Sequence, residues 1–359
     1  MDEAGKGFVE FTAPLYVAWE LTHRCNAHCV HCYSNSGPDA DLGDQLSLQS
    51  GLSLIDQLAD AGVLVLAFSG GEPMLHRHWR ELVAHAVQRG LSVNIASNGS
   101  CITDSNADDL RDLGVKSVTI SIDSHLPAIH DEFRQLDGLF EKAVKAIHLL
   151  VERGVRVVVG FTPTKLNWHD GRAVIDLAHS LGADAVNLSE YVPAGRGTID
   201  LALAPEDLHA TLQEWIQARE DYKGRMQIIW HDCRVALLVS EEDQRKYVGC
   251  GAGRLVARIL PDGAVTPCVF LPTRIGSLAS TPFKEMWAES ALLRQFRERA
   301  GHVGGNCGAC EHLATCGGCR SVAYAYSGGD ALAGDPHCWI LPAEPHLPAK
   351  LLEGEGLPV

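Results

Sequence analysis

The fold of this chain is decided by the stretch YVAWELTHRCNAHCVHC, residues 16–32. Its first half belongs to an apolar, β-rich run, Leu15–Leu21, and a short loop with Cys25, Cys29 and Cys32 follows. Three thiolates on one short loop suit three corners of an iron–sulfur cube, with the fourth iron left open. A zinc loop or chance cysteines are the alternatives at this point, although zinc more often takes four ligands at other spacings.

Starting with the run before this loop, β-rich runs alternate with segments of helical periodicity. The runs are 15–21, 63–69, 91–97, 115–122, 155–162 and 185–191, and the helical segments between them include 48–61, 79–89, 107–113, 140–153 and 171–181. Alternation with short connections is typical of parallel β/α units. Because the pattern stops near residue 200, short of the roughly 250 residues of a full eight-unit barrel, we predict an α/β fold with a (β/α)6 partial TIM barrel.

The rest of the chain changes character. Residues 205–247 read as a helical bridge that starts at Pro205, and residues 248–340 are rich in cysteine and glycine. A segment with so little apolar periodicity usually needs a metal or disulfide staple to fold. The predicted organisation is 1–13 N-terminal segment, 14–204 partial barrel, 205–247 bridge, 248–340 small cysteine-rich domain and 341–359 loose tail.

Polar residues stand where successive predicted strands end. Ser69-Gly70-Gly71-Glu72-Pro73 follows the second run, Asn98 the third, and Ser121 and Asp123 the fourth. Ligands of parallel sheets bind at the carboxyl ends of the strands. Glycines let a ligand approach the backbone, and Glu72 offers an acceptor to an ammonium group. Each motif alone also reads as an ordinary turn; together, behind a three-cysteine loop, they indicate a ligand site.

With the cysteine loop, the Gly70–Pro73 motif resembles the radical S-adenosylmethionine (radical SAM) superfamily over residues 14–200. The resemblance implies a [4Fe-4S] cluster at the cysteine loop, S-adenosylmethionine bound to its open iron, a 5'-deoxyadenosyl radical that abstracts a substrate hydrogen, and an electron donor of flavodoxin or ferredoxin type. The cofactor contacts that it implies are Glu72 with the methionine amino group, Gly70 and Gly71 beside it, Asn98 near the methionine or ribose, Ser121 and Asp123 near the ribose, and Arg134 and Arg196 as further candidates. Arg134 reads equally as a methionine-carboxylate ligand or a solvated helix residue, and Arg196 as a ligand clamp or a surface charge.

Seven further cysteines resemble the SPASM extension of these enzymes, which carries two auxiliary [4Fe-4S] clusters. The resemblance assigns Cys250, Cys268 and Cys319 to the first cluster, and Cys307, Cys310, Cys316 and Cys338 to the second. Two zinc ions are the alternative. The first set has only three ligands, so its fourth iron is either open to substrate or capped by Cys233 or another side chain.

Cys233 lies between the two cysteine-rich halves, and we take it as a candidate catalytic thiol that returns a hydrogen atom to a substrate radical. The alternative is an inert buried cysteine. The motif text is nearest to the mycofactocin and pyrroloquinoline quinone maturases and to haem-biosynthesis radical enzymes. We therefore expect modification of a ribosomally made peptide (oxidation, decarboxylation or crosslinking). The alternatives are a haem precursor, an aminoglycoside-type sugar, or an iron–sulfur or zinc protein without catalysis.

Composition and charge limit the classes of binding partner and the cellular location that we expect. Thirty Lys and Arg against 45 Asp and Glu give a formal charge of -15, which argues against a nucleic-acid backbone binder. No apolar run of about 18 residues predicts a membrane span, and residues 1–6 do not open a secretory signal. We expect a cytoplasmic protein with reduced cysteines. Only 24 residues precede Cys25, so a peptide substrate would need a separate recognition protein.

Overall fold

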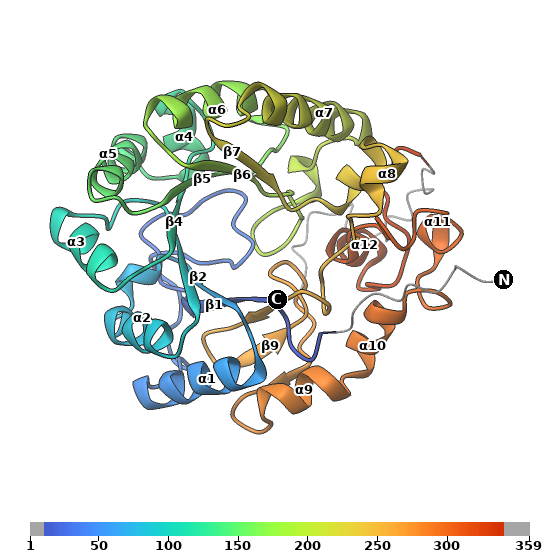
Figure 1. The fold of residues 1–359 in the computed structure, drawn as a ribbon, viewed down its shortest axis with the longest axis horizontal. Coiled ribbons are helices and arrows are strands. Elements are labelled where there is room, and N and C mark those ends of the chain that lie inside the picture. Colours follow the sequence, from blue (N-terminus) through green and yellow to red (C-terminus); the bar gives the residue numbers. More distant parts are fainter. Residues whose placement is uncertain (1–10, 341–359) are drawn as a thin grey trace.

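The computed structural model describes residues 11–340 and shows an α/β protein built on one sheet. The strand order is β10-β9-β8-β1-β2-β3-β4-β5-β6-β7. In Figure 1 the strands β1 to β7 form a curved inner wall, and the helices α1 to α7 lie outside it. The predicted partial barrel is confirmed. The expected tail, 341–359, and most of the segment 1–13 lie outside the described residues.

The strands are short and the helices longer. The strands are β1 (Tyr16–Thr22), β2 (Val65–Gly70), β3 (Ser92–Ser97), β4 (Ser117–Ser121), β5 (Val157–Phe161), β6 (Ala185–Leu188), β7 (Gln227–Trp230), β8 (Val256–Ile259), β9 (Ala264–Thr266) and β10 (Gly276–Ser277). The helices of the barrel are α1 (Leu48–Ala61), α2 (Trp79–Gln88), α3 (Asp104–Asp112), α4 (Pro127–Arg134), α5 (Leu139–Glu152), α6 (Gly171–Ser180) and α7 (Pro205–Asp221). The remaining helices are α8 (Glu241–Gln244), α9 (Phe283–Glu289), α10 (Ala291–Glu298), α11 (Gly305–Gly308) and α12 (Arg320–Ser327).

Local sequence explains the first β/α unit. Strand β1 is buried along nearly its whole length, as expected of a parallel strand covered on both faces. Helix α1 begins where the Ser47 side chain accepts a hydrogen bond from the Ser50 backbone N–H, and it ends at Gly62, whose φ of 90° is a left-handed cap. Its buried face, which includes Leu54 and Leu58, packs into the main core.

Several elements were not predicted from the sequence, and three of them bear directly on the barrel. The segment 205–247 carries α7, as expected, but also β7, which pairs in parallel with β6. Helix α4 was not predicted, and the cysteine-rich segment contributes β8, which pairs in parallel with β1. Strands of four residues and a helix of eight show too few turns of periodicity to stand out in a sequence.

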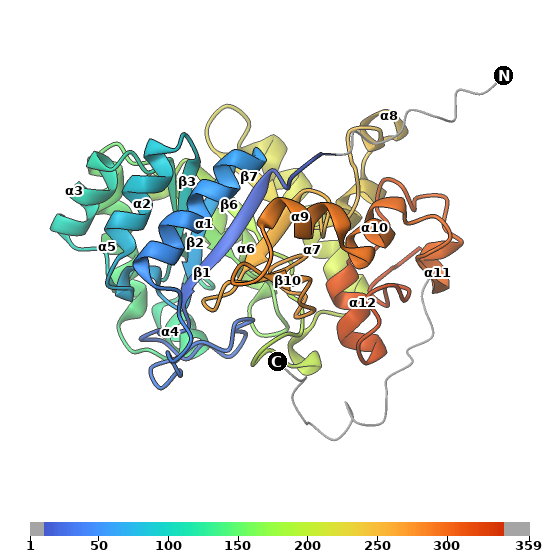
Figure 2. The ribbon, with the colours of Figure 1, turned by 90° about the horizontal axis from the view of Figure 1, so that it is seen from below.

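The pairing of β8 with β1 makes the cysteine-rich segment continuous with the barrel. A buried ion pair joins the same two strands, with Arg258 Nη1 3.4 Å from Glu20 Oε1. Figure 1 and Figure 2 show α9 to α12 on the side of the barrel where β8 to β10 continue the sheet beyond β1. The cysteine loop after β1 reaches the cysteine-rich segment through Tyr33, which contacts Phe270.

Candidate active site and auxiliary metal centres

The loop that carries Cys25, Cys29 and Cys32 is fixed by backbone hydrogen bonds at both its ends. The Cys25 N–H donates to the Gly37 carbonyl at 3.0 Å, and the Val30 N–H donates to the Phe133 carbonyl of α4 at 3.1 Å. All three cysteines are free thiols; Cys25 and Cys29 are buried and Cys32 is half-buried. The unpredicted helix α4 is thus a support of the cysteine loop.

The end of β2 is packed against the same loop. The Gly71 N–H donates to the Thr22 carbonyl at 2.7 Å, and the Glu72 N–H donates to the Arg24 carbonyl at 2.9 Å. A Cβ on Gly71 would clash with the Arg24 carbonyl and lie 3.0 Å from the Cys25 Cβ. Gly70 has a φ of 117°, and its Cβ would clash with the Thr22 carbonyl. Both glycines therefore permit a close contact of two backbones, a reason that the sequence did not reveal.

Glu72 is wholly buried at this edge of the sheet. Its carboxylate accepts hydrogen bonds from the Asn98 backbone N–H at 2.9 Å and from the Ser97 hydroxyl at 3.0 Å. Burial nevertheless dominates these donors and raises the pKa of Glu72 to about 7. Strand ends β2 and β3 are thus brought together as predicted.

Arg134 and Asp123 form a buried ion pair beneath the cysteine loop. Arg134 Nε lies 2.5 Å from Asp123 Oδ2, and Arg134 Nη1 lies 3.8 Å from the Cys29 sulfur. Of the two readings of Arg134, the solvated helix residue is wrong, because α4 turns its last residue inward onto Cys29; the contact with the methionine carboxylate stays a prediction. Asp123 also accepts a hydrogen bond from the Thr162 N–H at 3.4 Å. Burial by itself would raise the pKa of its carboxyl, but the positive charge of Arg134 outweighs burial and lowers that pKa.

Arg196 is not a free surface charge either. Its guanidinium donates to the carbonyls of Cys29 and Ser36, at 3.1 and 2.6 Å, and to the Asn35 side chain at 3.2 Å. Its own N–H donates to the Cys32 carbonyl at 2.9 Å. Arg196 therefore ties the loop after β6 to the cysteine loop.

Each of the three sulfurs lies near a polar side chain, and these neighbours bear on whether the cysteines suit a cluster. Asn98 Nδ2 lies 3.8 Å from the Cys25 sulfur, Arg134 reaches Cys29, and the Ser34 hydroxyl lies 3.5 Å from the Cys32 sulfur. Burial raises the pKa of the Cys25 thiol to about 12, the other two sulfurs adding to this. Hydrogen-bond donors near the sulfurs, and iron bound in place of the thiol protons, would offset the cost of burying three thiolates. The three cysteines therefore fit an iron–sulfur cluster.

Four carboxyl-terminal cysteines, Cys307, Cys310, Cys316 and Cys338, line one cavity. The Asp335 N–H donates to the Cys307 sulfur at 3.3 Å, and the His312 N–H donates to the Cys310 sulfur at 3.4 Å. This is the set predicted for the second auxiliary cluster. Within residues 11–340, no group of three His, Cys, Asp or Glu side chains converges on a point that suits a single metal ion; cysteines of a cubane bind different irons and stand further apart.

The three cysteines predicted for the first auxiliary cluster also lie near one another. Cys250 interacts electrostatically with both Cys268 and Cys319. The Ser321 hydroxyl donates to the Cys268 sulfur at 3.7 Å, and the Cys319 N–H donates to Asp335 Oδ2 at 2.8 Å. Asp335 thus touches ligands of both predicted clusters.

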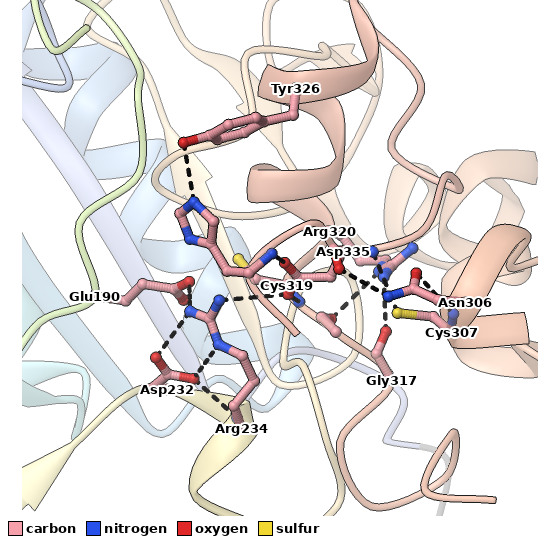
Figure 3. Close-up of polar contacts among 12 residues, drawn as sticks. Glu190, Asp232, Arg234, Asn306, Cys307, Gly317, Cys319, Arg320, Tyr326 and Asp335 are labelled. Carbon is pink, nitrogen blue, oxygen red and sulfur yellow. Dashed lines mark hydrogen bonds and ion pairs between the residues drawn. The ribbon is translucent and has the colours of Figure 1, made fainter. Parts of the chain in front are cut away.

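Sequence reasoning missed a buried ion network around Arg234, shown in Figure 3. Arg234 Nη2 contacts Glu190, at the end of the sixth predicted β-rich run, and lies 2.9 Å from Asp232 Oδ2; Nη1 lies 3.6 Å from Asp335. The Arg234 side chain is 1% exposed and lines the four-cysteine cavity. The sequence offered one signal of this network, the charged residues Asp232 and Arg234 on either side of Cys233. It did not reveal the distant partners, Glu190 and Asp335.

Comparison with known proteins decides the family. Residues 19–178 match the radical SAM superfamily, and residues 250–312 match the SPASM iron-sulfur cluster-binding domain. The chain is 30% identical to an "AdoMet-dependent heme synthase" of Methanosarcina barkeri, covering 92% of this chain and 98% of the relative. This chain belongs to the radical SAM superfamily and carries a SPASM domain.

Other relatives of this radical SAM/SPASM enzyme include a second heme synthase and a maturase. It is 31% identical to the heme synthase of Nitratidesulfovibrio vulgaris over 91% of this chain and 92% of that one. It is also 31% identical to the mycofactocin maturase of Mycobacterium tuberculosis, over 93% and 85%. Among solved structures, S-adenosylmethionine-bound SuiB of Streptococcus suis superposes with a TM-score of 0.72 at 18% identity, covering 86% of this chain and 73% of that one. That likeness concerns the fold.

The cofactors of the enzyme follow from its family: S-adenosylmethionine, one radical SAM cluster and two auxiliary iron–sulfur clusters. Cys25, Cys29 and Cys32 would hold the first cluster, which together with S-adenosylmethionine would supply radical chemistry that begins with hydrogen abstraction from a substrate. The chain's part is to position them, with Glu72 beside the loop. Asn98 and Arg134 hold the sulfurs, while Ser121 stands half-buried at the end of β4. The individual contacts with S-adenosylmethionine stay predictions. No helix among the described residues is long and apolar enough to cross a membrane.

Substitution of Gly71 tests the backbone contact. We expect Gly71→Ala to displace Arg24 and Cys25 and so to lower the iron bound after anaerobic reconstitution, from about 12 atoms per chain for three cubanes to about 8. Gly43→Ala is the control, because its Cβ would meet only Asp41 at 3.4 Å. Iron analysis with circular dichroism as a fold check makes the measurement. Full iron content in Gly71→Ala would contradict the role of this contact.

Glu72 predicts a pH dependence of cofactor binding. With a pKa raised to about 7, the carboxyl group is mostly ionised at pH 8 and mostly protonated at pH 6; only the ionised form would accept hydrogen bonds from the methionine amino group through both oxygens, as predicted. The ratio of the S-adenosylmethionine Kd at pH 6 to that at pH 8 should be about tenfold larger in the native chain than in Glu72→Gln. Calorimetry at both pH values measures it, with the exposed Glu141→Gln as control. Equal ratios in the native chain and Glu72→Gln would refute the contact.

Proposed function

We propose that this radical SAM/SPASM enzyme acts on a tetrapyrrole, and that it oxidises or decarboxylates a side chain of a haem precursor after hydrogen abstraction. The similarity to heme synthases carries the proposal, because it extends over 91% or more of this chain and 92% or more of two such relatives. The chain is also 29% identical to a "Pre-heme d1 synthase" of Dinoroseobacter shibae over 91% of its length. These similarities span both the radical SAM loop and the SPASM segment of this chain, between which a substrate would lie.

Residues between the two cysteine regions suit a flat, largely apolar ligand. Tyr33, directly after the cysteine loop, makes an edge-to-face contact with Phe270, their ring centroids 5.4 Å apart. Phe270 in turn packs against a small cluster of Val192, Cys319 and Val322. Aromatic and aliphatic side chains thus extend from the radical SAM loop to a ligand of the first auxiliary cluster. Such surfaces favour stacking with a macrocycle.

Peptide modification, the first expectation from the sequence, remains the second candidate. One observation favours it: the mycofactocin maturase relative matches 93% of this chain at 31% identity. For that reaction we propose a separate peptide-recognition protein. For either reaction we propose a cytoplasmic setting and a flavodoxin- or ferredoxin-type electron donor, since each needs one low-potential electron per radical.

The two candidates can be separated with defined substrates. Reconstituted enzyme, S-adenosylmethionine and reductant would be incubated anaerobically with iron-coproporphyrin III, with its metal-free form, and with a peptide whose gene neighbours that of the enzyme. We expect 5'-deoxyadenosine release to rise above the substrate-free rate only with a tetrapyrrole, and mass spectrometry to show a changed side chain. Cys25→Ala controls for chemistry that does not need the radical. Stimulation and mass change with the peptide alone would overturn the proposal.

A further inference from the structure

The cysteine-rich segment contains two buried arginines, Arg299 and Arg320, whose surroundings differ from those of Arg234. Arg299 caps the end of α10 and is 5% exposed, and Arg320 begins α12 and is 2% exposed. Within residues 11–340, their guanidinium groups donate to backbone carbonyls, and no Asp or Glu forms an ion pair with either. Arg234, by contrast, is bound to three carboxylates. Because an unpaired charge is costly to bury, Arg299 and Arg320 need a negative partner of another kind.

The Arg299 guanidinium lies between segments that carry cysteines of both predicted auxiliary clusters. It donates to the Cys250 carbonyl and, at 3.3 Å each, to the two carbonyls of the segment 313–314. Burial lowers its pKa, and the nearby sulfurs of Cys250, Cys233 and Cys316 oppose that effect. The backbone of Arg299 has a φ of 46°, which residues other than glycine rarely adopt. The chain thus accepts a strained conformation where this charge is placed among the cysteines.

The Arg320 guanidinium takes a similar place one helix further along the chain. It donates to the carbonyls of Gly317 and Gly318, at 2.7 and 3.3 Å, which are the two residues between two cluster cysteines. It also donates to two carbonyls of the segment 331–333, and Figure 3 shows it beside Cys307 and Gly317. Burial raises the pKa of the Cys307 thiol, and the Arg320 charge opposes that effect. Arg320 therefore follows a cysteine of the first predicted cluster and acts on a cysteine of the second.

Three glycines beside the cysteines make room for the two guanidinium groups. A Cβ on Gly249 would overlap Arg299 Nη1, and a Cβ on Gly317 would lie 2.9 Å from the same atom. A Cβ on Gly318 would lie 2.7 Å from Arg320 Nη2. All three glycines have a positive φ, between 65° and 71°, so the backbone next to the ligands is shaped around the arginines.

We propose that Arg299 and Arg320 are built-in counter-charges of the auxiliary clusters, and that they raise the reduction potentials of both. A cubane held by thiolates is negatively charged, and reduction adds a further negative charge. A fixed positive charge in a buried site therefore favours the reduced form. The same attraction supplies the negative partner that the two guanidinium groups need. The proposal rests on the family's auxiliary clusters and is independent of the substrate proposed above.

Redox titration followed by electron paramagnetic resonance tests the proposal without any turnover. The parent is the full chain with Cys25, Cys29 and Cys32 changed to alanine, so that the auxiliary clusters alone give a signal. We expect Arg299→Gln and Arg320→Gln each to lower the one-electron reduction constant of an auxiliary cluster at least threefold. At 59 mV for a tenfold change, this is a potential lower by about 28 mV. With about 8 iron atoms per chain retained for two cubanes, a smaller or an upward shift in both variants would overturn the proposal.

Lysine variants separate the charge from a merely structural role, and cover the case in which a glutamine variant binds no auxiliary iron. Arg299→Lys and Arg320→Lys keep the charge but lose the planar guanidinium, so we expect them to retain iron and to shift the potential less than the glutamine variants do. Arg111→Gln, which removes a surface charge on α3 at the far side of the barrel (Figure 1), is the control and should match the parent. Lysine variants that shift as far as the glutamine variants, or that lose iron with them, would overturn the proposal.

Discussion

The close contact between the backbones that follow β1 and β2 is the constraint on which the active site depends. Gly71 and Glu72 donate to the carbonyls of Thr22 and Arg24, one residue before the first cluster cysteine. Only glycine fits, since a side chain at Gly71 would overlap the Arg24 carbonyl. The contact sets the start of the cysteine loop and, in the same step, places the carboxylate of Glu72 next to it. The cluster cysteines and the predicted cofactor contact of Glu72 thus depend on the same backbone contact.

Buried ion pairs complete the support at three places. Arg134 with Asp123 lies beneath Cys29, Arg258 with Glu20 joins β8 to β1, and Arg234 joins Glu190 of the barrel to Asp335. Removal of one partner of such a pair typically costs about 3–5 kcal/mol, because the remaining charge stays buried. Pairs of this kind fix position better than they add stability. Here each lies within contact of a cluster ligand or joins the domains that carry the clusters.

Local patterns were enough to predict much of this. The apolar runs gave all six strands of the predicted barrel, and the cysteine spacing and the Gly70–Pro73 motif indicated the family. What the sequence left open depends on contacts between distant segments. The partners of Arg134 and Arg196 emerge only when α4 and the loop after β6 fold onto the cysteine loop. Likewise, nothing local to Cys233 says that Cys250 and Cys316, from another domain, will surround it.

Strands β7 and β8 show the same limit in the fold itself. Each has four residues, and each is stabilised by a neighbour far away in the chain, β6 and β1 respectively. Their addition turns the expected boundary between barrel and cysteine-rich segment into a continuous sheet. Because of that continuity, the cysteine loop and the auxiliary cysteines are held in one body, with the residues around Tyr33 and Phe270 between them.

The most direct measurement is the release of 5'-deoxyadenosine from S-adenosylmethionine by anaerobically reconstituted protein after chemical reduction, with iron counted in the same sample. We expect the native chain to bind iron and to form 5'-deoxyadenosine, and Cys29→Ala to form none while it keeps its auxiliary iron. Protein without iron, or product formation that survives the loss of Cys29, would contradict it.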